Sequence, residues 1–160
     1  MVVTTQTAER AYRSVTGRAR VSAHYTVADR AHLDLLPQET ILFDGAALVR
    51  EQEVTLTGSA TCLWAEVLIL GRAAMGETVT RLDLSDRRRI SRDGRPVFVE
   101  NLRLTDRALA ATGPAMLGAA APLPRWFWSP PMPLTGWNAR AWQWVQRAPP
   151  APLTANLWHG

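Results

Sequence analysis

Two histidines and an aspartate share the polar face of neighbouring segments near the start of the chain. Polar and apolar residues alternate in 19–27, which places His24 on the polar side, and they alternate again around His32 and Asp34. If the two segments pair as a hairpin, Asp34 lies opposite His24 and His32 is diagonal to it, within side-chain reach. Imidazole and carboxylate ligands suit Ni²⁺ or Zn²⁺. The alternative is a solvated polar face, which alternating antiparallel strands normally present to water.

Two glutamates lie beside or within apolar runs. Glu39 precedes a short apolar segment, and Glu66 is embedded in Trp64-Ala65-Glu66-Val67-Leu68. Burying a carboxylate without a partner is costly, so each must reach solvent or an arginine. The candidate partners are Arg10, Arg13 and Arg72. Two interpretations stay open, a buried structural ion pair and a polar group that lines an internal water channel.

No motif for nucleophilic catalysis or phosphate binding is present in the sequence. Gly-x-Ser-x-Gly and the P-loop pattern are both missing, and the acids show no spacing that implies a catalytic dyad. Cys62, the single cysteine, lies in an apolar run where a free thiol acts as a small hydrophobe, and it rules out a multi-cysteine zinc site. The triplet Arg87-Arg88-Arg89 is interspersed with acids and predicts a solvated hairpin end. We therefore expect a protein that is not an enzyme.

Composition sets further bounds. The chain has 160 residues, 47% hydrophobic and 20% charged, which fits one globular body. All 18 basic residues are arginine, and residues 1–120 hold 15 of them beside 14 acids, so the body is nearly neutral. That balance argues against the alternative of an RNA- or DNA-binding module that uses Arg and Trp stacking. No apolar run approaches the roughly 20 residues that span a bilayer, and no signal-peptide pattern opens the chain, so we expect a cytoplasmic protein without a membrane partner.

Period-2 alternation dominates the first hundred residues and predicts an all-β fold. Asp44-Gly45 and Asp93-Gly94 are both hairpin signals, because this dipeptide accepts the positive φ angles of a tight turn. Residues 105–112 are the candidate short helix, and 60–75 can be either a buried strand or a helix.

The last forty residues differ in kind. Residues 121–160 hold six of the seven Trp and eight of the eleven Pro, with no acid and no sustained period. Trp, Arg and Pro are what a GC-rich gene encodes when it is read out of frame. We therefore predict a β domain over 1–120 and an aberrant or disordered tail over 121–160, which sequencing of the genomic locus would test.

Three blocks of sequence resemble the urease accessory protein UreD (UreH) family over about residues 2–120. The first runs from Thr4 to Ser14, the second from Leu35 to Ala46, and the third from Leu70 to Glu77. Three blocks in the family's order and approximate spacing are a specific signal. The matching motif residues are Gln6, Arg13, Pro37, Gln38, Glu39, Gly71, Arg72, Met75, Gly76 and Glu77.

The resemblance implies a fold and a role. Family members resemble a β-helix-like stack of strands and hairpins with little helix. They bind the urease apoprotein, recruit UreF and the GTPase UreG in an accessory complex that we expect to be homodimeric, and pass nickel to urease. Transient Ni²⁺ and no tightly bound cofactor are expected, with Glu39, Glu66, His24, His32 and Asp34 as candidates for the nickel path.

The chain also departs from the family pattern. Members carry a strand-rich segment before the first block, and after the equivalent of residue 120 they continue with segments that the tail does not resemble. The resemblance therefore implies a domain that is incomplete at its N-terminus and altered at its C-terminus. The leading hypothesis is a scaffold for urease maturation, and the alternative is a truncated or frameshifted remnant without function.

Overall fold

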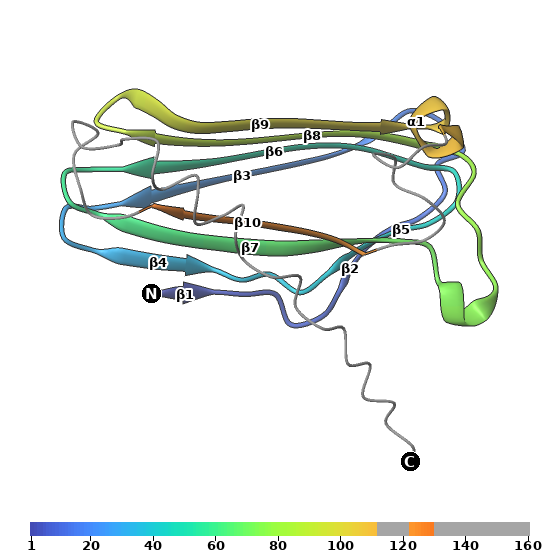
Figure 1. Cartoon of the computed structure of the whole chain (residues 1–160), viewed down its shortest axis with the longest axis horizontal. Helices are drawn as coiled ribbons and strands as arrows, with labels where there is room; N and C mark the ends of the chain where they lie inside the picture. Colours follow the sequence, from blue (N-terminus) through green and yellow to red (C-terminus); the bar gives the residue numbers. More distant parts are fainter. Residues whose placement is uncertain (112–121, 130–160) are drawn as a thin grey trace, which may run out of the picture.

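Strands dominate the molecule, and the all-β prediction is confirmed. The computed structural model describes residues 1–111 and 122–129, in which two β-sheets face one another (Figure 1). Sheet A contains β1 (Val2–Val3), β2 (Glu9–Ala11), β4 (His32–Leu35), β5 (Thr40–Leu42), β7 (Thr61–Leu70) and β10 (Leu123–Ser129). Sheet B contains β3 (Ala19–Val27), β6 (Ala46–Leu56), β8 (Leu82–Arg92) and β9 (Arg95–Thr105).

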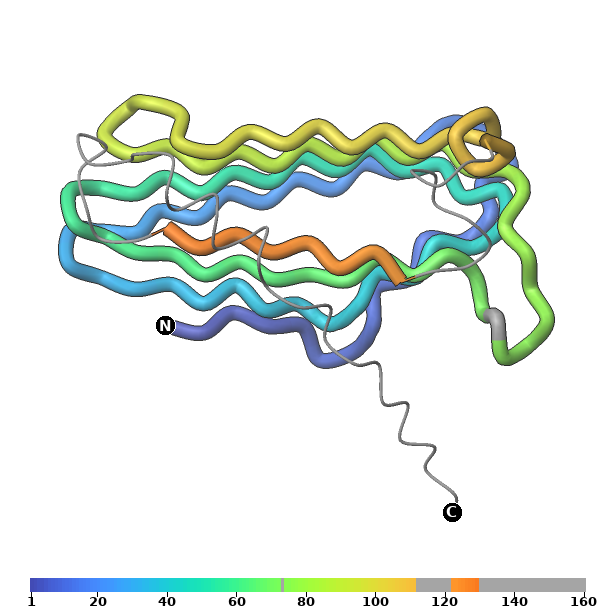
Figure 2. The backbone as a smooth tube through the Cα atoms, viewed as in Figure 1, coloured from blue at the N-terminus to red at the C-terminus, as the bar shows by residue number. Residues whose placement is uncertain are grey.

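The chain winds back and forth between the two sheets. After β3 in sheet B it crosses to β4 and β5 in sheet A, returns to β6 in sheet B, crosses to β7, and returns to β8 (Figure 2). As a result these strands pair in parallel, with β6 between β3 and β8, and with both β4 and β5 beside β7. The last step differs, because β8 and β9 form an antiparallel pair.

Of the predicted hairpins, the one at Asp93-Gly94 is confirmed and the other two are wrong. The turn at 28–31 and the turn at Asp44-Gly45 each carry the chain from one sheet to the other instead of folding it back within one. The aspartates of these two turns accept hydrogen bonds from other turns at the same end of the sheets. Asp29 accepts hydrogen bonds from the Ser59 N–H at 2.8 Å and from the Ser59 hydroxyl at 2.9 Å, while the Gly58 N–H donates to Asp93 at 2.9 Å. Tight turns with these residue types therefore stack at the ends of parallel strands as readily as they close hairpins.

Leu36 to Glu39 interrupt sheet A between β4 and β5, which lie between β7 and the outer strands β1 and β2. The segment separates β4 from β5, both of which pair with β7, and Pro37 has no N–H to continue the ladder. The break lies against the loop that separates β1 from β2, since the Gln38 N–H donates to the Thr5 hydroxyl at 3.0 Å and the Glu9 N–H to the Glu39 carbonyl at 2.9 Å. The first two family blocks are therefore neighbours in space.

Two apolar clusters fill the space between the sheets. One lies toward the turns at 28–31 and 57–60 and includes Val54, Trp64 and Ile90. The other lies toward the opposite turns and includes Leu68 and Leu84. Buried residues of the long strands alternate with mostly half-buried ones, as the period-2 pattern predicts, but midway along the strands the buried inward residues are charged.

The remaining predictions concern helices and the tail. Residues 105–112 contain α1 (Asp106–Ala110), which confirms the short helix, whereas the ambiguous stretch 60–75 forms β7 followed by the 3₁₀ turn η1 (Ala73–Met75). Inside 121–160, the described residues 123–129 form β10, antiparallel to β7, a strand that the sequence analysis does not predict. Residues 121 and 130–160 lie outside the described residues. In the part of the chain that the structure covers, no helix has the length and apolarity needed to cross a membrane.

Candidate functional site

A layer of six charged side chains separates the two apolar clusters. Five strands contribute to it, and four of the six residues are almost inaccessible to solvent. We call it the central ion-pair layer, and it consists of Arg50 (β6), Glu66 (β7), Asp86 and Arg88 (β8), Glu100 (β9) and Arg125 (β10). Three arginines face three carboxylates, so the layer has no net charge when all six are ionised.

Arg50 is the centre of the layer and is 2% exposed. It holds Asp86 with two hydrogen bonds, from Nε to Oδ1 at 3.2 Å and from Nη2 to Oδ2 at 2.6 Å. Its Nη1 contacts Glu66 and donates to the Thr40 hydroxyl at 3.2 Å. This two-point pairing with Asp86 is the geometry in which a guanidinium binds a carboxylate most strongly.

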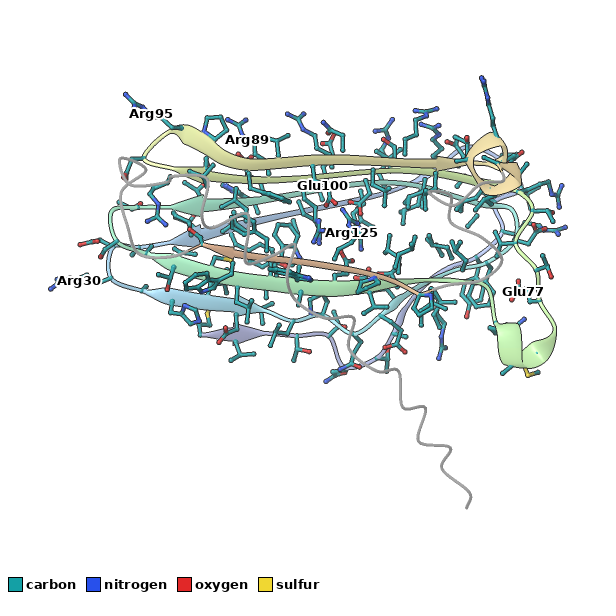
Figure 3. The ribbon with its side chains drawn as sticks, viewed as in Figure 1. Arg30, Glu77, Arg89, Arg95, Glu100 and Arg125 are labelled. Atoms are coloured by element: carbon teal, nitrogen blue, oxygen red, sulfur yellow. The ribbon has the colours of Figure 1, made fainter. Side chains whose placement is uncertain are left out.

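Arg88 and Arg125 complete the layer from the other side. Both hold Glu100, with Arg88 Nε at 2.8 Å and Arg125 Nη2 at 2.5 Å from Oε2. Arg125 also donates to Asp86, and each of the two arginines has a nitrogen 3.8 Å from Glu66 Oε2. The guanidinium of Arg88 lies over the Trp64 ring, 4.9 Å from its centroid, which favours a cation–π contact. Figure 3 shows Arg125 and Glu100 converging from the two sheets.

The charges of the layer control its titration. Burial alone would raise the pKa of Asp86, but the hydrogen bonds from Arg50 and the charges of Arg50 and Arg125 hold it below its ordinary value. Burial likewise opposes ionisation of Glu100, and Arg125 and Arg88 outweigh it, so the pKa of Glu100 is also lowered. Both carboxylates are therefore ionised at neutral pH.

These lowered pKa values predict a loss of stability in acid. The unfolded chain takes up protons near the ordinary carboxyl pKa of about 4, whereas the folded chain resists protonation, so acid favours unfolding. We expect the urea midpoint to stay nearly constant from about pH 7 to about pH 5 and to fall as the pH drops below about 4. Urea titrations followed by tryptophan fluorescence would measure this. Equal midpoints at about pH 3 and about pH 7 would contradict the assignment.

The structure separates the residues that the sequence groups as nickel candidates. His24 lies in sheet B, where its Nε2 is 3.2 Å from the Thr55 hydroxyl, while His32 and Asp34 lie in sheet A. The predicted register that places His24 opposite Asp34 is therefore wrong, because the chain changes sheets between them. His32 and Asp34 do meet, with Nε2 and Oδ1 2.8 Å apart. Among residues 1–111 and 122–129, no three His, Cys, Asp or Glu side chains are close enough to hold a metal ion together.

The two candidate glutamates occupy different environments. Glu66 is buried and contacts Arg50, so its predicted partners Arg10, Arg13 and Arg72 are wrong. The ion-pair interpretation of Glu66 is the one that these contacts support. Glu39 is half-buried in the break between β4 and β5. Near this break the central ion-pair layer approaches the surface. Glu9, whose side chain is 44% exposed, lies 3.8 Å from Arg50 Nη1. Glu9 also lines a groove of about 500 Å³.

Two further predictions can be compared with the structure. Cys62 is fully buried in an apolar cluster, and burial together with the charge of Asp34 raises the pKa of its thiol to about 11, which agrees with its assignment as a small hydrophobe. The triplet at 87–89 lies in the middle of β8 rather than at a hairpin end, which corrects that prediction. Arg88 points inward, and Arg89 lies 3.6 Å from Glu53.

The first, second and third family blocks converge at one end of the sheets. Asp44, in the turn between β5 and β6, accepts hydrogen bonds from the N–H groups of Thr80 and Arg81, both at 2.9 Å, and these hold the pKa of Asp44 well below its ordinary value. Its other oxygen lies 3.2 Å from Arg13 and 3.4 Å from Arg81. Asp44 therefore joins the turn after β2 to the loop between β7 and β8.

Glu77, the last residue of the third family block, fixes the conformation of that block. Glu77 accepts hydrogen bonds from the N–H and the Nε of Arg72, both at 3.1 Å, and from the Asp44 N–H at 3.3 Å. Gly71 has a φ of +65°, and a Cβ atom there would lie 2.9 Å from Val79, so glycine is required. Met75 and Gly76 are exposed at the tip, and Gln6, Pro37 and Gln38 lie away from this end in the breaks of sheet A.

Known proteins resemble this chain over most of its length. The family model described as UreD urease accessory protein matches residues 1–144. The urease accessory protein UreD of Cereibacter sphaeroides (strain ATCC 17029 / ATH 2.4.9) is 59% identical over 108 residues, which cover 68% of this chain and 39% of that protein. UreD of Paracoccus denitrificans (strain Pd 1222) is 52% identical over 120 residues, 74% of this chain and 43% of that protein. The chain thus spans about two fifths of the length of these curated relatives.

Proposed function

Because this chain belongs to the UreD family of urease accessory proteins, we propose that it acts in urease maturation as a non-catalytic scaffold. The observation that carries the proposal is the family match over residues 1–144. The relatives are named accessory proteins rather than enzymes, in agreement with the prediction from the sequence. In this proposal the chain works in the cytoplasm, on the urease apoprotein.

The finer role follows the family resemblance. The chain binds apo-urease together with UreF and UreG, within a homodimeric accessory complex, while nickel is incorporated. The parallel winding between two sheets supports a β-helix-like stack. A rigid stack suits a scaffold, since it holds several binding surfaces at fixed separations.

Nickel is cargo in this proposal, and its contacts with the chain are transient. Glu66 is already paired with arginines in the central ion-pair layer, so its carboxylate is a poor ligand for a passing cation. The half-buried carboxylates of Asp34 and Glu39 are the better candidates for such a contact, since both ring nitrogens of His32 already meet Thr61 and Asp34. Imidazole and carboxylate are suitable ligands for Ni²⁺.

Co-expression with the urease subunits, UreF, UreG and nickel tests the function. The host lacks its own UreD, and urease activity in the lysate is compared with a strain that lacks this chain. We expect activity above that background. A chain that accumulates as folded protein without raising the activity would contradict the proposal.

The second candidate is a remnant of such a scaffold without function. It is favoured by the coverage of about two fifths of each relative and by the acid-free, Trp- and Pro-rich composition of 121–160. Restoring a full-length gene of a relative in the same host distinguishes the two candidates. Activity with the relative but none with this chain assigns the remnant.

A further inference from the structure

Basic and apolar side chains are exposed together at the end of the sheets where the family blocks converge. The loop between β7 and β8 projects beyond the strands at this end, carrying η1 at its tip (Figures 1 and 2). We call the exposed residues here the turn-end surface, and they are Tyr12, Arg13, Val15, Arg72, Met75 and Arg81. The exposed fraction is 63% for Tyr12, 93% for Val15 and 73% for Met75.

The arginines of this surface are oriented but not neutralised. Arg13 and Arg81, with side chains 62% and 59% exposed, share the single carboxylate of Asp44. The acceptor capacity of Asp44 is largely taken by Thr80 and by the Arg81 N–H, so both guanidinium groups keep donors that face solvent. Nearby, Arg18 and Arg103 share Asp83 in the same manner. Counting Arg72 with Glu77, the five arginines and three carboxylates of these ion pairs carry a net charge of two positive units.

One apolar side chain of the surface, that of Tyr12, packs on a buried residue. Tyr12 stacks on Phe43 with ring centroids 4.9 Å apart and an interplanar angle of 15°, and the Arg72 guanidinium lies 4.9 Å from the centroid of the same ring. Phe43 itself is buried. Tyr, Met and Arg are enriched at protein interfaces, and pre-oriented side chains lose less entropy when a partner binds.

On these grounds, and resting on the proposed scaffold function, we propose that the turn-end surface is the docking site for an acidic segment of a protein partner in urease maturation. Carboxylates of that segment bind the free donors of Arg13 and Arg81. An apolar side chain between them packs on Met75 and Tyr12. At the opposite end of the sheets the turns expose Asp29 and Asp93 beside Arg30 and Arg95, one acid for each arginine.

Binding of purified full-length chain to apo-urease and, separately, to UreF tests the inference. Met75→Ala removes an exposed anchor, and Arg81→Glu reverses one charge. We expect Met75→Ala to weaken binding to one of the two probes at least about fivefold, and Arg81→Glu about tenfold or more, with wild-type binding declining as salt is raised. Val99→Ala on the outer face of β9 and Arg95→Glu at the opposite turn are the matched controls and should keep wild-type affinity.

Each variant is first checked for an unchanged thermal midpoint, and Met75→Ala keeps the test decisive if Arg81→Glu disturbs Asp44. Wild-type affinity in a folded Met75→Ala protein, together with wild-type affinity in any folded Arg81→Glu protein, overturns the docking site and leaves the scaffold function standing. Failure of the wild-type chain to bind either probe overturns both.

Discussion

Replacing Arg50 with methionine is expected to lower the free energy of unfolding by about 3–5 kcal/mol, the usual cost of breaking a buried ion pair from one side. Arg50 is 2% exposed and contacts both Glu66 and Asp86. Its loss leaves two buried carboxylates with Arg88 and Arg125, which already hold Glu100. Methionine fills much of the same volume, so the effect comes from charge rather than from a cavity.

Urea unfolding at neutral pH measures this change, with Arg95→Met as the matched control. Arg95 is exposed at the turn between β8 and β9, so the same substitution there should change stability by less than about 0.5 kcal/mol. Adding Asp86→Leu to Arg50→Met should recover part of the loss, because a buried charge pair replaced as a unit costs little. A single Arg50→Met variant within about 1 kcal/mol of the wild type would show that solvent reaches the layer.

The sequence predicts which residues form strands but not how the strands pair. Alternation identifies β3 and β6 because their inward positions are mostly apolar, and it identifies β8 through Leu82 and Leu84 at its start. Parallel and antiparallel pairing impose the same period of two on a strand, so the pattern cannot distinguish a hairpin from a crossing between sheets. The turn at Asp44-Gly45 illustrates this, since its aspartate is used by Thr80 and Arg81, about 36 residues along the chain.

The sequence carries a signal for the central ion-pair layer, which is a charged residue two positions after an apolar inward residue. Arg50 follows Leu48 in phase, Asp86 follows Leu84 in phase, and Glu66 follows Trp64 in phase. Each is a charged residue at an inward position. The register of β6 and β8 brings Arg50 beside Asp86, and Glu66 meets Arg50 from the facing sheet. The predicted partners of Glu66, which are Arg10, Arg13 and Arg72, are therefore wrong, whereas a search for charges at inward positions finds Arg50, Asp86 and Arg88.

The sequence cannot predict β10 for a different reason. The stretch from Leu123 to Ser129 holds three aromatic residues that favour a strand, but Pro124 interrupts it and both of its tryptophans are exposed. Its pairing with β7 depends on a free sheet edge and on Arg125, which meets Asp86 and Glu100 across the interior. These are tertiary contacts that no local pattern contains.

Replacing Trp64 with alanine is the second change with a large expected effect, a loss of about 3–5 kcal/mol. Trp64 is fully buried in the apolar cluster near the turns at 28–31 and 57–60, and its ring lies under Arg88. Alanine leaves a cavity that the flanking strands cannot close, and it removes the cation–π contact that helps to accommodate a buried guanidinium.

Trp126→Ala supplies the matched control, because Trp126 in β10 lies directly across from Ala65 on the neighbouring strand and is 60% exposed. The same substitution there should cost less than about 1 kcal/mol, since little buried area is lost. Urea unfolding of both variants, followed by circular dichroism so that loss of a fluorophore does not confuse the readout, gives the comparison. Equal losses would mean that the outer face of sheet A is covered in solution, and the assignment of Trp126 as exposed would be wrong. A large loss of stability for Trp64→Ala and a small one for Trp126→Ala would place the core of the molecule between the sheets. Arg88 links that core to the central ion-pair layer.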